Sequence, residues 1–250
     1  EETRIPQAVH HMERVIETFR LMAQQWKVVE TLEPQDFLNF RDKLGRASGF
    51  ESAQMRIMEA LMGEIWVDGK LVSGKAWESF KEDKSLYDVV CEWLQRTPIQ
   101  GSVPDSSSDS STVSEFVESF LESHKSLYPD TASGAEDFLK PNGKVHRGRA
   151  GLLFIESYRE LPLLAWPRKL VSTLIELEEA MVLWRSSHAR TVERVIGRRV
   201  GTGGSSGVDY LDMTTKYRVF VDLWSIRSIL IKKSALPTLQ NPEFYGFQGD

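Results

Sequence analysis

The stretch that decides the fold is LVSTLIELEEAMVLWRSSHARTVERV, which runs from Leu170 to Val195. Its apolar residues recur every three or four positions, the spacing at which side chains line one face of an α-helix. We therefore predict one long amphipathic helix here, with its apolar stripe turned toward a core. The stripe contains Leu170, Leu174, Leu177, Met181, Trp184, Val192 and Val195.

His188 lies on this stripe, four residues after Trp184, so the spacing that turns the leucines inward also turns its imidazole inward. A buried neutral imidazole needs partners for its ring nitrogens, or burial costs about 1–3 kcal/mol. One interpretation of His188 is therefore a core histidine bonded to the backbone. The charged residues of the stretch are predicted to lie mostly on the other faces of the helix; they are Glu178, Glu179, Arg185, Arg190, Glu193 and Arg194.

The second interpretation makes His188 a metal or heme ligand. The stripe holds no second histidine, cysteine or paired carboxylate three or four residues from His188, which a zinc or di-iron site would require. A lone inward histidine suits heme, which needs one protein ligand, better than a bare metal ion. The pattern by itself leaves both interpretations open.

Helical spacing extends over most of the chain. Residues 6–32 are predicted to form another long amphipathic helix, a short helix begins at Pro34, and a third occupies residues 51–64. Further helices are predicted near residues 113–127 and after Pro167. We find no period-two strand pattern with hairpin turns. The predicted fold is all-α, a helical bundle.

Length and composition favour a single domain over residues 1–250. The chain has 250 residues, of which 41% are hydrophobic and 27% charged, enough for one sizeable core. Residues 97–112 are rich in Ser, Asp and Pro and cannot bury enough apolar surface to offset the entropy of ordering. They are predicted to form a mobile surface insertion, and residues 128–151 a second loop.

The composition also narrows the classes of function. A net charge of -5 without a basic stripe argues against a nucleic-acid partner. No apolar run approaches the roughly 20 residues of a membrane-spanning helix, and the first residues lack the apolar region of a signal peptide. The single cysteine, Cys91, excludes an intrachain disulfide and suits a reducing compartment. We therefore expect a cytoplasmic protein with neither a nucleic-acid nor a membrane partner.

The sequence GTGGSSG, from Gly201 to Gly207, follows the long helix. One interpretation is a flexible linker, and another is a phosphate-binding loop. The loop lacks the lysine of a phosphate-binding loop and follows a helix, whereas nucleotide-binding glycine motifs follow a strand. Apolar sequence resumes at residues 217–231, so the loop lies within the fold. Glycine backbone can approach a ligand closely, and Thr202 offers a hydroxyl.

Four motifs, taken together and in this order, resemble the tryptophan 2,3-dioxygenase family, whose members belong to the histidine-ligated heme-dependent aromatic oxygenases. The resemblance extends from about Ala8 to Leu230, with the Ser/Asp-rich insertion unmatched. It implies an all-α heme-binding bundle. The motifs are FLNFRDKLGRASGFESAQMR (37–56), YRELPLL (158–164), LWRSSHARTVERVIGRRVGTGGSSG (183–207) and YRVFVDLW (217–224).

The resemblance implies roles for particular residues. His188 matches the axial ligand of heme b, with Trp184 beside it. Arg41 matches the arginine that holds the carboxylate of the amino-acid substrate, a role suited to a planar guanidinium fork. Thr202 matches a residue that contacts the ammonium and carboxylate of the substrate, and Gly201 belongs to the same loop. The remaining matches are the apolar pocket walls Phe37 and Leu44, and Ser48 near the heme edge.

The chain departs from the family pattern in two ways. Arg46 and Glu51 stand where the family usually has Pro and Gln. The family also carries helices ahead of the matched region that supply a distal histidine and aromatic pocket residues. His10 and His11 do not match that motif, so we identify no catalytic base in this chain. Either the distal side comes from an N-terminal segment, on this polypeptide or a separate one, or this relative works differently.

The function that the resemblance implies is a heme-dependent dioxygenase that opens the indole 2,3-bond of tryptophan with O2 to give N-formylkynurenine, working as a homo-oligomer, either a tetramer or a dimer. One alternative is a heme-dependent monooxygenase or hydroxylase of a tryptophan- or tyrosine-like amino acid in a biosynthetic pathway. Another is a non-catalytic heme-binding relative. The presence of Arg41 and Thr202 favours an enzyme, because a heme binder needs no clamp for an amino acid.

Overall fold

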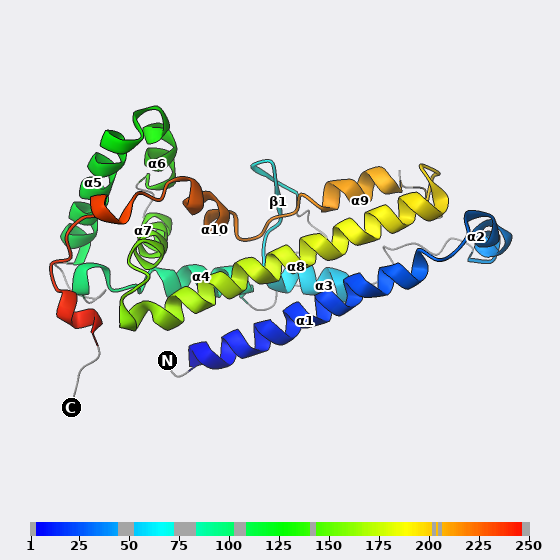
Figure 1. Cartoon of the computed structure of the whole chain (residues 1–250), viewed down its shortest axis with the longest axis horizontal. Coiled ribbons are helices and arrows are strands. Elements are labelled where there is room, and N and C mark those ends of the chain that lie inside the picture. The colour runs from blue at the N-terminus through cyan, green and yellow to red at the C-terminus, as the bar shows by residue number, and fades with distance from the viewer. Residues whose placement is uncertain are drawn as a thin grey trace. The chain divides into compact units, whose positions relative to one another are not determined.

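The computed structural model describes residues 4–44, 53–72, 84–102, 109–140, 144–201, 204 and 207–246. Helices make up nearly all of the regular structure in these residues, which confirms the all-α prediction (Figure 1). The chain divides into two compact units. We call residues 8–85 and 173–219 the helix-pair unit, and residues 1–7, 86–172 and 220–250 the C-terminal unit. The single domain over residues 1–250 stays a prediction.

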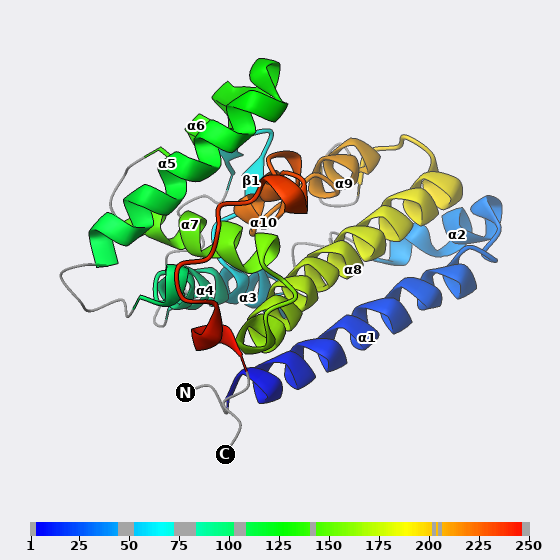
Figure 2. The same ribbon diagram turned by 60° about the vertical axis from the view of Figure 1, so that its left-hand side comes forward.

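Two long helices give the helix-pair unit its name, α1 (Ile5–Val29) and α8 (Ala165–Ile196). They run side by side in the same direction within this unit, as both views show (Figures 1 and 2). Arg20 Nη2 pairs with Glu176 Oε1 at 2.5 Å. The predicted apolar stripe of α1 is confirmed at Val9, Met12, Ile16 and Phe19, which are buried, whereas Trp26 is half-buried and Met22, at the same spacing, is 37% exposed.

The core-facing stripe of α8 is confirmed by its buried Leu170, Leu174, Leu177, Met181 and Val195. The prediction that the charged residues lie on other faces is wrong for two of them, because Glu178 and Arg185 are only 3% and 6% exposed. The helix has neighbours on a second face, formed by α3 (Ala53–Met62) and the chain near Val219. A charged group can lie on such a face only when it is paired.

α8 begins at Ala165, two residues before Pro167, where we had placed its start. Proline is tolerated there because the N–H groups of the first turn have no partner within the helix. The short helix that begins at Pro34 is α2 (Pro34–Arg41), which is followed by the 3₁₀ turn η2 (Asp42–Leu44).

A small hairpin follows α3, contrary to the expectation that no hairpin is present. Its strands are β1 (Trp66–Val67) and β2 (Lys70–Leu71), paired antiparallel. The turn between them is Asp68–Gly69, with φ values of 48° and 76°. Two adjacent positive φ angles are what a two-residue type I′ turn requires, and Asp-Gly is a preferred pair for it. Strands of two residues are too short to show a period-two pattern.

The hairpin is also tied to the segment that precedes α10 (Val221–Ser225). Trp66 N donates to Arg218 O at 2.8 Å, and Arg218 N donates back to Trp66 O at 3.0 Å. This isolated bridge holds the end of α3 against the chain that returns after α9 (Val208–Thr214). Residues 217–219 are therefore placed along the inner side of α3 and α8.

In the C-terminal unit, α4 (Leu86–Leu94), α5 (Asp109–Leu127) and α7 (Lys144–Ser157) form the core. The prediction of a loop over residues 128–151 is wrong, because this stretch contains the turn η6 (Pro129–Thr131), α6 (Ala132–Phe138) and half of α7. Helix forms here because scattered apolar residues reach the core despite the polar composition between them. They include Ala135, Phe138, Leu139 and Ala150.

Both ends of the predicted insertion, residues 97–112, have regular structure. The turn η5 (Ile99–Gly101) buries Ile99 and Gln100, and residues 109–112 are the first turn of α5. The Gln100 side chain donates to Thr238 O at 3.2 Å and accepts from Gln240 N at 2.8 Å. These bonds dock the C-terminal segment on η5. Residues 103–108 lie outside the described residues, and mobility of the insertion stays a prediction.

The C-terminal segment continues through short turns. Tyr245 is fully buried, accepts from Gly101 N at 2.8 Å and donates to Pro98 O. None of the described helices is both long and apolar enough to cross a membrane. The turns are η7 (Pro162–Leu164), η8 (Ile226–Ser228), η9 (Lys233–Ala235) and η10 (Pro242–Tyr245).

We predict that Gly151→Ala destabilises the protein although alanine favours helices. A Cβ on Gly151 would lie 2.4 Å from Leu94 O and 2.8 Å from Thr97 Oγ1, so α7 would have to move away from α4. We expect a loss of about 1–3 kcal/mol of unfolding free energy in urea denaturation. Gly148→Ala is the matched control on the same helix, because its Cβ would meet nothing closer than 3.6 Å. It should be neutral or stabilise by up to ~1 kcal/mol. Equal stability of the two variants would contradict this account.

Candidate functional site

His188 lies on α8 in an aromatic environment. Its imidazole is stacked on the Trp26 indole of α1, with ring centroids 4.4 Å apart and an interplanar angle of 7°. The Trp184 ring, one turn earlier on α8, lies 6.0 Å away. Burial lowers the pKa of His188 from its usual value of 6.5, because desolvation disfavours the charged ring. The imidazole is therefore neutral at pH 7.

The stack covers a face of the His188 ring and leaves the two ring nitrogens, which lie in the ring plane, clear of the indole. Within the part of the chain that the structure describes, no residue forms a hydrogen bond with this imidazole. The backbone partner that a core histidine would need is thus not found among these residues. A neutral imidazole with an accessible nitrogen lone pair has the chemistry of an axial heme ligand. The donor therefore fits the cofactor that the sequence predicts.

Arg41 is the last residue of α2 and lies close to the glycine loop. Its Nη2 donates to the backbone carbonyl of Val200 at 2.5 Å. Val200 directly precedes Gly201, so the structure brings together two of the predicted substrate-binding residues that are far apart in the sequence. A guanidinium has five N–H donors. The bond to Val200 leaves the other donors of Arg41 for a ligand.

The described part of the glycine loop folds back on itself. Gly204 N donates to Gly201 O at 2.9 Å. Gly207 has φ +57°, and a Cβ there would lie 2.9 Å from Arg199 O. Position 207 therefore requires glycine, both for its backbone conformation and for the close approach of the two ends of the loop. Thr202 lies outside the described residues.

The predicted pocket walls are Phe37, which lies in α2, and Leu44, which ends the turn η2. Phe37 is half-buried and packs edge-to-face on Phe40, with ring centroids 5.1 Å apart. Leu44 is 45% exposed. The α-helical spacing that would align Leu44 with Phe37 and Arg41 ends at Arg41, because the chain continues as the tighter turn η2. Ser48 lies outside the described residues, as do the departures at positions 46 and 51.

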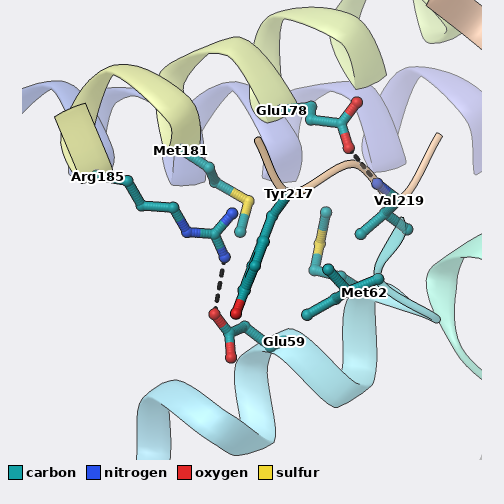
Figure 3. Close-up of a pocket in the computed structure, with 8 residues that line it drawn as sticks. Glu59, Met62, Glu178, Met181, Arg185, Tyr217 and Val219 are labelled. Carbon is teal, nitrogen blue, oxygen red and sulfur yellow. Dashed lines mark hydrogen bonds and ion pairs between the residues drawn. The ribbon is translucent and has the colours of Figure 1, made fainter. Parts of the chain in front are cut away.

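The sequence analysis missed a buried polar cluster beside α8, which we call the Glu59 cluster (Figure 3). Glu59 on α3 accepts from Arg185 Nη2 at Oε1, 2.7 Å away, and from Arg56 Nη1 at Oε2, 2.8 Å away. Arg56 Nη2 also donates to the Tyr210 hydroxyl of α9 at 3.2 Å. The cluster consists of Glu59, Arg56, Arg185, Tyr210 and Tyr217.

Burial governs the chemistry of this cluster. Desolvation lowers the pKa of Arg185, and Glu59 opposes that shift. The Arg185 guanidinium lies over the Tyr217 ring, 4.9 Å from its centroid. Burial raises the pKa of Tyr217 to about 12, so its phenol stays neutral. Removing one partner of such a buried pair costs about 3–5 kcal/mol, because the other charge is left unpaired.

A small cavity lies at one side of the cluster, where Glu59, Arg185 and Tyr217 form part of its lining (Figure 3). It has space for about one water molecule, and its polar lining includes Glu59, Arg185 and Glu178. Glu178 accepts a hydrogen bond from Val219 N, which holds the returning chain against α8. A cavity of this size cannot hold an amino acid or a heme. No cluster of potential metal ligands is found among the described residues.

Little in the sequence distinguishes Glu59 and Arg185 from surface residues. Glu59 lies in a helix with charges on several faces, and Arg185 follows Trp184 directly. The only local signal is that Arg185 and Glu178 lie four and three residues from Met181, at positions that share its side of the helix. Their partners come from elsewhere in the chain, so the pairing could not be inferred from local spacing.

The comparisons with known proteins agree with the motifs. Residues 1–230 match the family model described as tryptophan 2,3-dioxygenase. Tryptophan 2,3-dioxygenase 2 of Ralstonia nicotianae is 38% identical over 96% of this chain and 78% of the relative. Tryptophan 2,3-dioxygenase of Sorangium cellulosum is 37% identical over 98% of this chain and 72% of the relative. A tryptophan 2,3-dioxygenase-like protein of Xanthomonas campestris is 38% identical over 85% of this chain and 97% of the relative. The chain belongs to the tryptophan 2,3-dioxygenase family.

Proposed function

We propose that this protein is a heme-dependent dioxygenase that opens the indole 2,3-bond of tryptophan with O2 and forms N-formylkynurenine. The observation that carries the proposal is the family match over residues 1–230, which includes every residue proposed for the site. The contact of Arg41 with Val200 and the neutral imidazole of His188 support it, because they belong to the two halves of such a site. A homo-oligomer and a cytoplasmic location are part of the same proposal.

His188 would hold the heme iron through one of its ring nitrogens. The neutral state of the imidazole favours this role, because a protonated ring has no lone pair to donate. Trp184 and Trp26 would restrict the rotation of the ring by packing against it. When bound, a heme with this imidazole ligand would supply the iron chemistry that activates O2.

Arg41 would bind the carboxylate of the substrate through two parallel N–H groups, and Thr202 would contact its ammonium and carboxylate. Phe37 and Leu44 would confine the indole ring, and Ser48 would lie near the heme edge. These residues fix orientation, and orientation is a large part of what an enzyme contributes when two reactants must meet in one geometry. No residue of this chain is assigned as a catalytic base.

The alternative is a monooxygenase of a related aromatic amino acid, or a non-catalytic heme-binding relative. One observation is consistent with these alternative functions. The Xanthomonas campestris relative, which this chain matches over 97% of its length, is named only as tryptophan 2,3-dioxygenase-like. The activity test below separates these possibilities.

The first prediction of this proposal concerns the axial ligand. His188→Ala should abolish most of the heme binding, because it removes the neutral imidazole that we assign as the axial ligand. The measurement is the Soret absorbance and the heme content of the purified protein. His10→Ala, which changes an exposed histidine on α1, is the control and should keep the parent heme content. A parent-like Soret band in His188→Ala would exclude the assignment.

The second prediction concerns the carboxylate clamp. Arg41→Lys keeps the positive charge and loses the planar fork, so the affinity for tryptophan should fall roughly ten- to a hundredfold or more, equivalent to about 1.5–3 kcal/mol. Heme content should not change. Titration of the heme-loaded protein with tryptophan measures the affinity, and Arg20→Lys on the exposed side of α1 is the control. Unchanged affinity in Arg41→Lys would rule out the clamp.

The third prediction concerns the reaction. The reduced, heme-loaded protein, supplied with tryptophan and labelled dioxygen, should give a product that contains both labelled oxygen atoms. Product mass is the measurement, and tyrosine is the competing substrate. Incorporation of one labelled atom, or reaction with tyrosine while tryptophan is inert, would replace the dioxygenase with the monooxygenase alternative. No turnover of either amino acid by heme-loaded protein would favour the non-catalytic relative.

A further inference from the structure

The Glu59 cluster and the His188 imidazole lie on neighbouring parts of the same helix. Arg185 precedes His188 by three residues on α8, which is less than one helical turn and about 4.5 Å along the axis. The two side chains contact different neighbours. Arg185 reaches Glu59 on α3, whereas His188 stacks on Trp26 of α1. The position of α8 relative to α3 is therefore set within one turn of the histidine.

The contacts of His188 itself leave freedom along the helix axis. The Trp26 stack is a contact between two flat rings, and such a contact fixes the axial position of α8 less strictly than an ion pair with hydrogen bonds does. The buried stripe of α8 has a repeat of three and four residues, so a shifted helix would present similar apolar surface to its neighbours. These contacts hold α8 in the core without defining one register.

The ion pair between Glu59 and Arg185 has no such freedom. The side chains are 4% and 7% exposed, and both carboxylate oxygens of Glu59 are in use. If α8 slid by one turn, to the next register of its apolar stripe, the Arg185 charge would be buried without its partner. Such a state is strongly disfavoured, and a single buried polar contact can thereby select one register among similar ones.

We infer that Glu59 and Arg185 are positioning residues that set the axial position and rotation of α8 at His188. This inference rests on the proposed function only for what His188 then binds. The physical reason to look beyond stability is that a buried ion pair can often be replaced by uncharged residues of similar volume without loss of stability. The pair therefore contributes mainly to the geometry of the helices and less to the free energy of folding.

The test separates stability from position. Arg185→Met leaves the buried Glu59 with one cation fewer and should be less stable than the parent in urea. The double variant Glu59→Gln/Arg185→Met removes both charges of the pair together, and the amide oxygen at position 59 can still accept from Arg56. We expect its denaturation midpoint to return to that of the parent.

The position of His188 is read from the ring signals of the full chain, labelled with ¹³C-histidine and prepared without heme. The stacked Trp26 indole shifts the His188 ring protons upfield in the parent, and the signal is assigned by its loss in His188→Ala. The double variant should lose much of this upfield shift despite its recovered stability. Its ferrous Soret maximum, measured after heme loading, should also differ from that of the parent.

The matched control removes an exposed ion pair of α8. Arg20 and Glu176 have side chains that are 46% and 40% exposed, and Arg20→Gln/Glu176→Gln should leave the His188 signals unchanged. If the double variant of the cluster fails to fold, Arg185→Lys replaces it as the test. Lysine keeps the charge and loses the guanidinium contact over Tyr217. It should shift the His188 signals by a smaller amount than expected for the double variant.

Parent-like His188 signals in a stable double variant would overturn the inference, and so would parent-like signals in Arg185→Lys if the double variant does not fold. Because the histidine spectrum is recorded without heme, its outcome does not depend on which cofactor the protein takes. Failure of the parent to bind heme would contradict the proposed function and leave the positioning result standing.

Discussion

Glu59 and Arg185 are charged residues in the interior of the helix-pair unit, and their burial is made possible by the ion pair between them. Their ion pair links α3 to α8, and Arg56 extends it to Tyr210 at the start of α9. One set of polar contacts thus joins three helices. They are α8, which carries His188, α3, which follows the predicted substrate residues, and α9, which follows the glycine loop. These contacts are directional, whereas apolar packing alone would leave the alignment of the three helices less strictly defined.

The candidate site is assembled from segments that are distant in the sequence. Arg41 ends α2, and its partner Val200 follows α8. His188 and Trp26 come from the two parallel helices and meet as stacked rings. The substrate half therefore contains a directional hydrogen bond, and the heme half contains an aromatic stack. This division suits a heme enzyme, because the cofactor needs an apolar enclosure and the zwitterionic end of an amino acid needs fixed donors.

The errors of the sequence analysis have a common physical origin. Residues 128–151 look like a loop because their apolar residues are sparse, yet Ala135, Phe138 and Ala150 reach a core that other helices supply. The Asp68–Gly69 turn was overlooked because strands of two residues show no alternation. Glu178 and Arg185 were placed on the surface because a charge is normally solvated. For the helices of residues 128–151 and for the buried charges, the deciding partners lie far away in the chain, where local patterns carry no information.

The sequence by itself determined the all-α architecture, the long helices near residues 6–32 and 170–195, and the family, because helical periodicity and short motifs are local properties of the chain. It also placed His188 on the same stripe as Trp184. Only the tertiary structure decided that Trp26 covers the imidazole, that Arg41 meets Val200, and that Glu59 neutralises Arg185 inside the protein. These contacts join residues from different helices, and which helices become neighbours is settled by burial and charge pairing over the whole fold.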